Sequence, residues 1–278
     1  MERAAFGLAH RAVSANCLFC FARQLWRGIP CWIDSLEFAR TNPRRDDQAV
    51  MKDQDRLRAE YARRAQDPRY AEWYARTNAA NRFIEADRDT ALKRAFDEFP
   101  QLLAPTARVL DVGCGAGGEL AKLQQRLDAR NLFGVDLLWE RVCRGKEQYP
   151  LLNLFWGDAS HLPFRDGAFD LAMQFTMFSS ILDDALRRRI ASEMLRVLKP
   201  RGAVLWYDYF FNPTNAQTRG IGKRELRALF PKCSYHVWRV TLAPPLARWL
   251  APRSLKMCEW LNRIPFLRSH YLALVIKD

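Results

Sequence analysis

Four glycines follow a short apolar segment that ends at residue 112, and their spacing suits the binding of a charged ligand. The sequence there reads Asp111-Val-Gly113-Cys-Gly115-Ala-Gly117-Gly118. A loop without bulky side chains lets a ligand approach the backbone amides and the first turn of a following helix. Two more carboxylates, Asp136 and Asp158, stand at the ends of the next apolar segments. These acids and the glycine loop are the first candidates for a binding site.

The elements that must position these residues alternate in type along the chain. Strands are predicted over residues 107–112, 131–136, 152–157, 168–174, 203–208, 234–242 and 271–277, and helices over 119–127, 139–146, 184–198 and 223–230. Such alternation is typical of a parallel sheet with helices on both faces. Ligands of these folds bind outside the carboxyl ends of the strands. The three acids are therefore expected at one edge of the sheet.

Three parts are predicted along the chain. Residues 1–50 form an N-terminal extension, which is either a targeting segment or lies upstream of a start at Met51 and outside the fold. Residues 51–105 show helical spacing, interrupted at Pro68, and form a helical cap. Residues 106–278 form the ligand-binding domain, with an insertion over 243–269 before the last strand.

Composition narrows the class of protein and its partners. With 278 residues, 49% of them hydrophobic, the chain can bury a core, which excludes fibrous and wholly disordered classes. Lys and Arg number 44 against 31 Asp and Glu, a net charge of +13 that favours an anionic partner. Seven scattered cysteines and no apolar stretch of membrane-spanning length indicate a cytoplasmic location, with peripheral contact at a membrane. No metal is expected, because Cys17 and Cys20 lack a second pair at zinc-site spacing.

A nicotinamide-dependent oxidoreductase is one interpretation of the glycine loop. Gly113, Gly115 and Gly118 satisfy the dinucleotide pattern G-x-G-x-x-G, and Asp136 ends the next strand where that pattern places its ribose-binding acid. Asp111 argues against a dinucleotide, because a carboxylate there repels a pyrophosphate and attracts a cationic sulfonium ligand. The helical segment that precedes the first strand is also unusual for a dinucleotide-binding domain.

Two later stretches complete the pattern, from Gly157 to Asp170 and from Glu193 to Gly202. Together with the Asp111 loop, they make residues 107–210 resemble the class I S-adenosylmethionine-dependent methyltransferases, in the branch that includes quinone and small-molecule methylating enzymes. The resemblance implies a doubly wound, seven-stranded, mostly parallel sheet of α/β class, with N-terminal helices and a helical lid insertion before an antiparallel last strand. It also implies S-adenosyl-L-methionine as the cofactor.

The resemblance assigns the cofactor contacts residue by residue. They are expected from Asp111, Gly113, Cys114, Gly115, Gly117, Asp136, Leu137, Asp158, Ala159, Gln174 and Phe175. The loop would hold the amino acid part of the cofactor, Asp136 both ribose hydroxyls, and Asp158 the adenine amino group. Each acid also has a purely structural interpretation: Asp111 binds loop amides, Asp136 caps a helix, and Asp158 makes a turn.

Candidates for the methyl-accepting side must lie at the same sheet edge. Asp208 and Tyr209 end the fifth strand, and His270 starts the antiparallel last strand, so these three are the candidate catalytic residues, with His270 the first choice for a base. The insertion is expected to overhang this side. Its Trp and Arg residues suit a membrane interface through residues 243–268, whereas no RNA-binding module is visible.

The function predicted is O-methylation of a small molecule, a sugar, or a lipid-linked or envelope glycan. Two alternatives stay open at this point: the oxidoreductase, and a cofactor-binding module without catalysis that uses its basic surface to contact a membrane or protein.

Overall fold

The computed structural model of the chain describes residues 45–213 and 215–278. Cys17 and Cys20, for which no metal is expected, lie outside these ranges. Most of the predicted N-terminal extension lies outside them as well. Among the described residues, no group of three or more His, Cys, Asp or Glu side chains could hold a metal ion.

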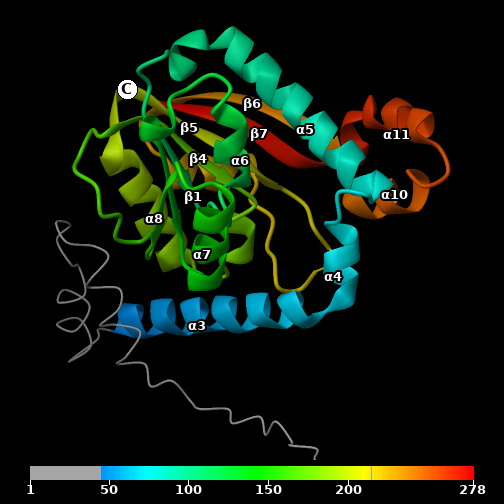
Figure 1. Ribbon diagram of the computed structural model, residues 1–278, viewed down its shortest axis with the longest axis horizontal. Coiled ribbons are helices and arrows are strands. Elements are labelled where there is room, and N and C mark those ends of the chain that lie inside the picture. Colours follow the sequence, from blue (N-terminus) through cyan, green and yellow to red (C-terminus); the bar gives the residue numbers. More distant parts are fainter. Residues whose placement is uncertain (1–44, 214) are drawn as a thin grey trace, which may run out of the picture. The chain divides into compact units, whose positions relative to one another are not determined.

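Seven strands form one sheet in the order β3-β2-β1-β4-β5-β7-β6 (Figure 1). The strands are β1 Val109–Val112, β2 Leu132–Asp136, β3 Asn153–Trp156, β4 Phe169–Phe175, β5 Leu198–Tyr209, β6 Cys233–Leu242 and β7 Arg268–Lys277. Strand β7 runs antiparallel to both β5 and β6, and the pairs among β1 to β5 are parallel. The doubly wound, mostly parallel sheet predicted from the sequence is confirmed.

Helices cover both faces of this sheet and its carboxyl edge (Figure 1). They are α3 Arg45–Gln66, α4 Pro68–Trp73, α5 Ala79–Glu98, α6 Gly118–Leu123, α7 Trp139–Gln148, α8 Asp184–Val197, α9 Lys223–Leu229, α10 Pro244–Leu250 and α11 Leu255–Asn262. Short 3-10 turns are η1 Pro100–Leu103, η2 Ala129–Asn131, η3 Phe178–Ser180 and η4 Pro265–Leu267. Helix α3 starts upstream of Met51, where the sequence placed the beginning of the cap.

Local chemistry explains where the N-terminal helices begin and end. The proline at position 68 stands at the first position of α4, where its missing amide hydrogen costs nothing. Asp67 caps α4 by accepting a hydrogen bond from Arg69 N at 3.0 Å. Asn78 caps α5 in the same way, accepting from the amides of Ala80 and Asn81.

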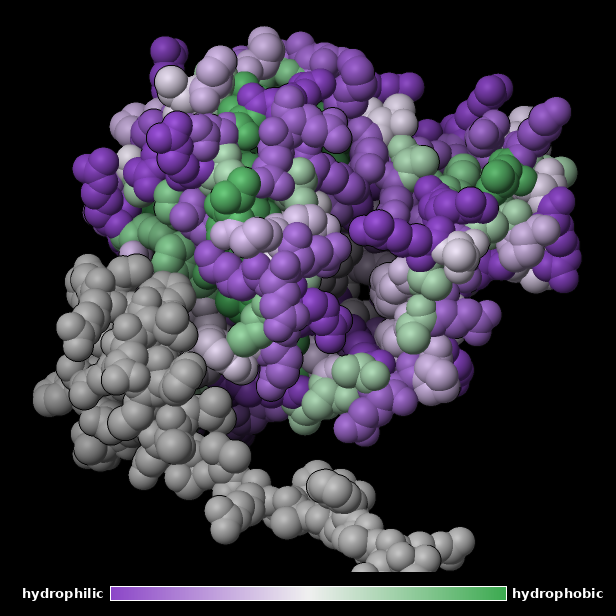
Figure 2. Space-filling view, viewed as in Figure 1, coloured by the Kyte–Doolittle hydropathy of each residue, from purple (hydrophilic) through white to green (hydrophobic). Residues whose placement is uncertain are grey.

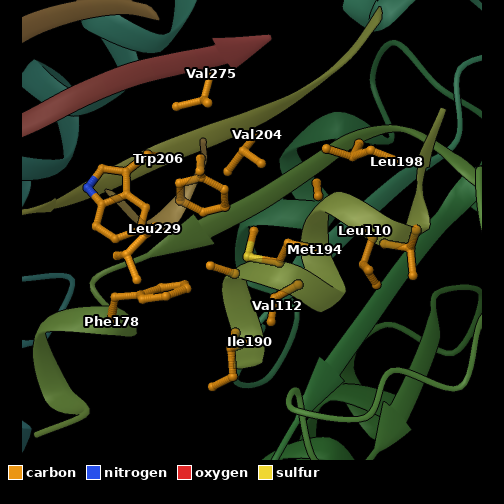
Figure 3. Packing of buried hydrophobic residues seen from close by; sticks show 14 of the residues in the cluster. Leu110, Val112, Phe178, Ile190, Met194, Leu198, Val204, Trp206, Leu229 and Val275 are labelled. Carbon is orange, nitrogen blue, oxygen red and sulfur yellow. The ribbon is translucent and has the colours of Figure 1, made fainter. Parts of the chain in front are cut away.

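The core divides into two layers because residues along each strand alternate between the faces of the sheet. Leu110, Trp206 and Val275 point to the layer of α8 and α9, where they pack with Phe178 and Met194 (Figure 3). On the opposite face the side chains of Val109, Met173, Leu205, Tyr207 and Leu272 pack against α5, α6 and α7. Consecutive residues of β5 therefore point to opposite faces of the sheet. The site candidates Asp208 and Tyr209 are consecutive, so their side chains lie in different layers.

The insertion before β7 folds as α10, α11 and η4. Its two ends are joined by a hydrogen bond from Ala243 N to Leu267 O of 2.9 Å. The inner side of the insertion packs on α5 and β6 through Leu242, Ala247, Leu250 and Cys258. The predicted helical insertion is thus present. No helix in the described part of the chain is long and apolar enough to cross a membrane.

Candidate functional site

Three acidic side chains lie along the carboxyl edge of neighbouring strands. Strands β1, β2 and β3 are parallel neighbours, with Asp111 opposite Gly134 and Asp136 opposite Trp156. Asp111 belongs to β1, Asp136 ends β2, and Asp158 follows the end of β3. The sheet brings together carboxylates that the sequence keeps far apart.

The glycine loop between β1 and α6 needs glycine for both conformation and space. Gly113 has a φ of +78°, and a Cβ atom there would lie 2.9 Å from Met177 Cγ. The amides of Gly113 and Cys114 donate to Val135 O at 2.8 and 3.1 Å, which fixes the loop against β2. Gly117, also at positive φ, is the residue before α6. Cys114 is buried, and burial raises the pKa of its thiol, so the thiol stays protonated and unreactive.

Asp136 ties the glycine loop to the start of α7. Its Oδ2 accepts a hydrogen bond from Gly115 N at 2.8 Å, and its Oδ1 accepts one from Leu138 N at 2.9 Å. Leu138 is the residue before α7, and no side chain caps this helix, so Asp136 fixes the turn between β2 and α7 without capping the helix. A carboxylate offers about four acceptor sites. Two of them are used here, which leaves capacity for the two ribose hydroxyls expected from the sequence.

Asp111 is a buried carboxylate with an unused oxygen. Its side chain is 2% exposed, and its Oδ1 has no hydrogen-bond partner. Burial, followed by the charges of Glu119 and Asp136, raises the pKa of Asp111 well above its usual range. Buried polar atoms without a partner are uncommon and call for an explanation. An oxygen in this state suits a cationic group that enters the crevice.

Arg88 of α5 is a site residue that the sequence analysis missed. Its Nη2 donates to Glu119 Oε1 at 2.6 Å, and its guanidinium lies 5.5 Å from the ring centre of Phe175 and 5.7 Å from that of Tyr207. Its Nε is buried and lacks a partner, and its charge acts on Asp111. The available signal was a charged residue one helical turn before buried Leu92, on the face of α5 that packs against the sheet.

Asp158 receives hydrogen bonds from the turn that follows it and from α3. Ser160 N donates to Oδ1 at 2.8 Å, and Ser160 Oγ and Gln54 Nε2 donate to Oδ2 at 2.7 and 2.8 Å. Burial opposes ionisation, but the hydrogen bonds from His161, Ser160 and Gln54 outweigh it and lower the pKa of Asp158 to about 2. The turn interpretation therefore holds. Gln54, which the sequence did not single out, brings an amide group to the carboxylate expected to bind the adenine amino group.

The remaining cofactor candidates line the same edge. Gln174 is fully buried in β4 and holds the following loop, since its Oε1 accepts from Met177 N at 3.0 Å. Phe175 packs at the end of β4 beneath Arg88. Leu137 and Ala159 are half-buried beside the core, the first after β2 and the second after β3. Each candidate thus lies at a strand end, as the sequence predicted.

His270 and Tyr209 meet at the other end of the edge. They are register partners in the antiparallel pair of β5 and β7, with ring centres 3.9 Å apart. His270 also stacks on Tyr207 at 4.8 Å, and its Nδ1 shares a 3.0 Å hydrogen bond with Ser269 Oγ. Burial, together with the charge of Arg88, lowers the pKa of His270 to about 3, so the imidazole is neutral at neutral pH.

Asp208 belongs to the opposite layer. It neighbours Tyr209 in β5, so its side chain points to the α8 face. Its Oδ2 accepts from Ser179 N at 3.0 Å and its Oδ1 from Tyr209 N at 2.8 Å. Burial raises the pKa of Asp208 to about 6, although these hydrogen bonds oppose the rise. The structure therefore brings two of the three catalytic candidates together and places the third where it holds the loop after β4.

Comparison with known families decides the class of this domain. A family model described as a methyltransferase domain matches residues 109–202. The matched segment begins in β1, ends in β5 and includes the glycine loop with all three acids. Residues 109–202 form a class I S-adenosylmethionine-dependent methyltransferase domain.

Curated relatives agree with this class. The chain is 33% identical over 116 residues to a phthiotriol/phenolphthiotriol dimycocerosates methyltransferase of Mycobacterium ulcerans, in an alignment that covers 39% of this chain and 39% of that protein. It is 33% identical over 109 residues to a demethylmenaquinone methyltransferase of Beutenbergia cavernae, covering 39% of this chain and 43% of that protein. The chain thus spans about two fifths of the length of either relative.

The fold has a relative of known structure. The PH0226 protein from Pyrococcus horikoshii OT3 superimposes with a TM-score of 0.54 and 17% sequence identity, covering 79% of this chain and 99% of that one. The similarity extends beyond the segment that the family model matches. The fold that the two proteins share therefore includes much of this chain.

The cofactor of the methyltransferase domain is S-adenosyl-L-methionine, and the crevice has the chemistry to hold it. The amino acid part of this cofactor carries an ammonium group and a carboxylate. Asp111 Oδ1 is a buried acceptor without a partner and Arg88 Nε a buried donor without one, and the charge of Arg88 acts on Asp111. An acceptor and a donor of opposite charge match a zwitterion. A pyrophosphate, which has no cationic group, would leave Asp111 unpaired.

Proposed function

We propose that this protein transfers a methyl group from S-adenosylmethionine to a hydroxyl oxygen of a small molecule, a sugar, or a lipid-linked or envelope glycan. The observation that carries the proposal is that Asp111 Oδ1, a buried acceptor, and Arg88 Nε, a buried donor, both lack a hydrogen-bond partner, while the charge of Arg88 acts on Asp111. It supports a cationic amino acid ligand and disfavours a diphosphate.

Each part of the cofactor has a residue suited to it in this proposal. Arg88 binds the carboxylate and Asp111 the ammonium group, where desolvation strengthens charge-assisted hydrogen bonds. Asp136 accepts from the ribose hydroxyls with its remaining lone pairs. Asp158 accepts from the adenine amino group, in place of or beside Gln54. When bound, S-adenosylmethionine would supply a methyl carbon on a sulfonium centre: a hydroxyl oxygen would take this methyl group, S-adenosylhomocysteine would leave as the thioether with the electrons of the broken C–S bond, and the hydroxyl proton would pass to solvent.

The acceptor side is assigned to the aromatic residues at the ends of β5 and β7. His270 is neutral and buried, so it can accept a hydrogen bond from a hydroxyl group and orient one lone pair of the acceptor oxygen. Its low proton affinity makes it a weak base. Orientation is therefore its main contribution, with Tyr209 beside it. Asp208 acts as a positioning residue, because it fixes the loop after β4 through Ser179 N.

A lipid-linked acceptor is the version of this proposal that the insertion favours. Relatives of the domain are named for action on phthiotriol and phenolphthiotriol dimycocerosates and on demethylmenaquinone. In this chain α10 lies next to the acceptor end, since Arg248 stacks on Trp73 of α4 at 4.5 Å and its charge acts on Tyr209. The insertion would then serve the acceptor, with residues 243–268 in peripheral contact with a membrane.

Mass spectrometry of cell extract incubated with the protein and methyl-labelled S-adenosylmethionine tests the function. The expected result is a labelled product in the lipid or glycan fraction, lost with Asp136→Ala. No labelled product in any fraction, with no affinity for S-adenosylhomocysteine, would overturn the proposal. Binding of a nicotinamide dinucleotide instead would favour an oxidoreductase. Full cellular function of the Asp136→Ala protein would favour a module without catalysis.

A further inference from the structure

Large apolar side chains are exposed on the insertion before β7. Among the described residues, eleven large apolar side chains are exposed, and five of them lie within residues 249–266. We name this surface the α10–α11 patch; it consists of Trp249, Leu255, Met257, Trp260 and Phe266 with the exposed basic residues Arg253, Lys256 and Arg263. Phe266 is 77% exposed and Trp249 61%. Such clustering marks an interaction surface more often than scattered single residues do.

The inner side of the insertion is already fixed to the domain. Cys258 and Leu250 pack in the small core formed with α5, and Ser254 caps α11 by accepting from Met257 N at 3.2 Å. The exposed apolar residues are therefore additional to those that hold the insertion in place. They stand on a short, anchored helical segment at the edge of the domain (Figure 1).

The charge of the patch is positive. Residues 243–269 contain five basic side chains and one acid, Glu259. At about 100° per residue, Lys256 and Glu259 fall between Leu255 and Trp260 around α11, and Arg263, directly after the helix, continues the same sector. Figure 2 shows apolar residues over α11 with hydrophilic ones around them. Apolar and cationic side chains lie side by side on this surface. Such a surface suits contact at the depth of lipid headgroups rather than deep insertion into the bilayer.

The patch lies beside the acceptor end of the sheet. Helix α10 carries Trp249 on its outer side and Arg248 next to it, and Arg248 stacks on Trp73 of α4. The charge of Arg248 also acts on Tyr209, the register partner of His270. A surface that is held by the α10–α11 patch would therefore be next to the residues assigned to the acceptor.

We propose that the α10–α11 patch docks the protein on an anionic lipid bilayer, from which a lipid-linked acceptor reaches His270 and Tyr209. The purpose of the docking rests on the function proposed above, but the docking itself does not require methyl transfer. Aliphatic Leu255 and Met257 favour a bilayer over single-stranded RNA, because bases stack on aromatic and guanidinium groups. The concentration of basic residues disfavours a second copy of the same patch, which would bring like charges together.

Flotation of the full chain with phosphatidylcholine vesicles, with and without phosphatidylglycerol, tests the docking. The wild-type protein is expected to float with the anionic vesicles and to dissociate as salt rises. Because each basic residue near an anionic surface contributes about 1 kcal/mol, Lys256→Gln combined with Arg263→Gln is expected to weaken partitioning roughly thirtyfold. Trp260→Ser combined with Phe266→Ser is expected to weaken it on both kinds of vesicle.

A matched control comes from another exposed tryptophan. Trp139 is 52% exposed at the start of α7, outside the patch, and Trp139→Ser is expected to float like the wild type. All variants are expected to bind S-adenosylhomocysteine as the wild type does, which separates a failure of docking from a failure of the proposed function. Equal flotation of patch variants and wild type would overturn the docking proposal. If the patch variants lose only RNA binding, the patch contacts RNA and the docking proposal is overturned. If they lose only self-association, as measured by light scattering, the patch contacts a second copy of the chain and the proposal is likewise overturned.

Discussion

Replacement of Arg88 should weaken binding of the amino acid part of the cofactor and leave the adenosine part unaffected. Arg88 Nε is a buried donor without a partner, and the charge of Arg88 acts on Asp111, whose Oδ1 also lacks a partner. A hydrogen bond to a charged group contributes about 1.5–3 kcal/mol, so its loss in Arg88→Met corresponds to a roughly 10- to 100-fold weaker affinity for S-adenosylhomocysteine. Arg88→Lys keeps the positive charge but not the planar set of guanidinium donors. Its affinity for S-adenosylhomocysteine is expected to lie between those of the wild type and Arg88→Met.

The control ligand is 5′-methylthioadenosine, which has the adenosine and the sulfur atom but no amino acid. Its affinity is expected to stay within about twofold of wild type in both variants, as measured by calorimetric titration. Thermal melting checks that loss of the ion pair with Glu119 has not unfolded the protein. An equal loss of affinity for both ligands, or none for S-adenosylhomocysteine, would refute the assignment of Arg88.

The further predictions concern three buried titratable groups. Burial raises the pKa of Asp111, so its carboxyl group ionises only at a pH above the usual aspartate range. Affinity for S-adenosylhomocysteine is therefore expected to rise with pH above that range, whereas the affinity of Asp111→Asn is expected not to change with pH. A raised pKa in the folded state also means that ionisation favours the unfolded chain, so Asp111→Asn is expected to resist urea better than wild type at neutral pH, and a less stable variant would contradict this. In Asp208→Asn, the side-chain NH₂ group replaces one carboxylate oxygen and faces a backbone N–H donor, either Ser179 N or Tyr209 N, so one of these hydrogen bonds is lost. The variant is expected to lower turnover more than cofactor affinity. Unchanged turnover would contradict the positioning role of Asp208. Because burial lowers the pKa of His270 to about 3, the pH dependence of turnover is expected to show no titration of this residue between about pH 5 and 8. His270→Ala is expected to lower turnover more than cofactor affinity. A change of turnover with pH in that range that disappears in the variant would contradict the neutral imidazole.

The strands, the glycine loop and its acids could be predicted because their signals are local. Alternating strands and helices fixed the sheet edge, and Asp111, Asp136 and Asp158 each follow from the position of a strand end. Of the structural alternatives that the sequence allowed, the turn at Asp158 is present, where Ser160 N donates to Oδ1. Asp136 holds loop amides without capping α7, and Asp111 Oδ1 has no partner. The proposed binding roles are compatible with these contacts, because a carboxylate has more acceptor sites than one contact uses.

Contacts that cross the chain could not be predicted. Gln54 reaches Asp158 across 104 positions in the sequence, and Arg88 reaches Glu119 across 31. Both come from helices whose placement depends on tertiary packing rather than on a motif. The sequence also could not tell which face of β5 carries the acceptor side. Alternation separates Asp208 from Tyr209, but only packing against α5 or α8 shows which of the two meets His270.

The central claim is that the crevice at the ends of β1, β2 and β3 binds a cationic amino acid nucleoside rather than a diphosphate. Calorimetric titration of the unmodified protein with S-adenosylhomocysteine and, separately, with NAD measures this directly. The account predicts one saturable site for S-adenosylhomocysteine and no heat of binding for NAD. Saturable binding of NAD with none of S-adenosylhomocysteine would contradict it.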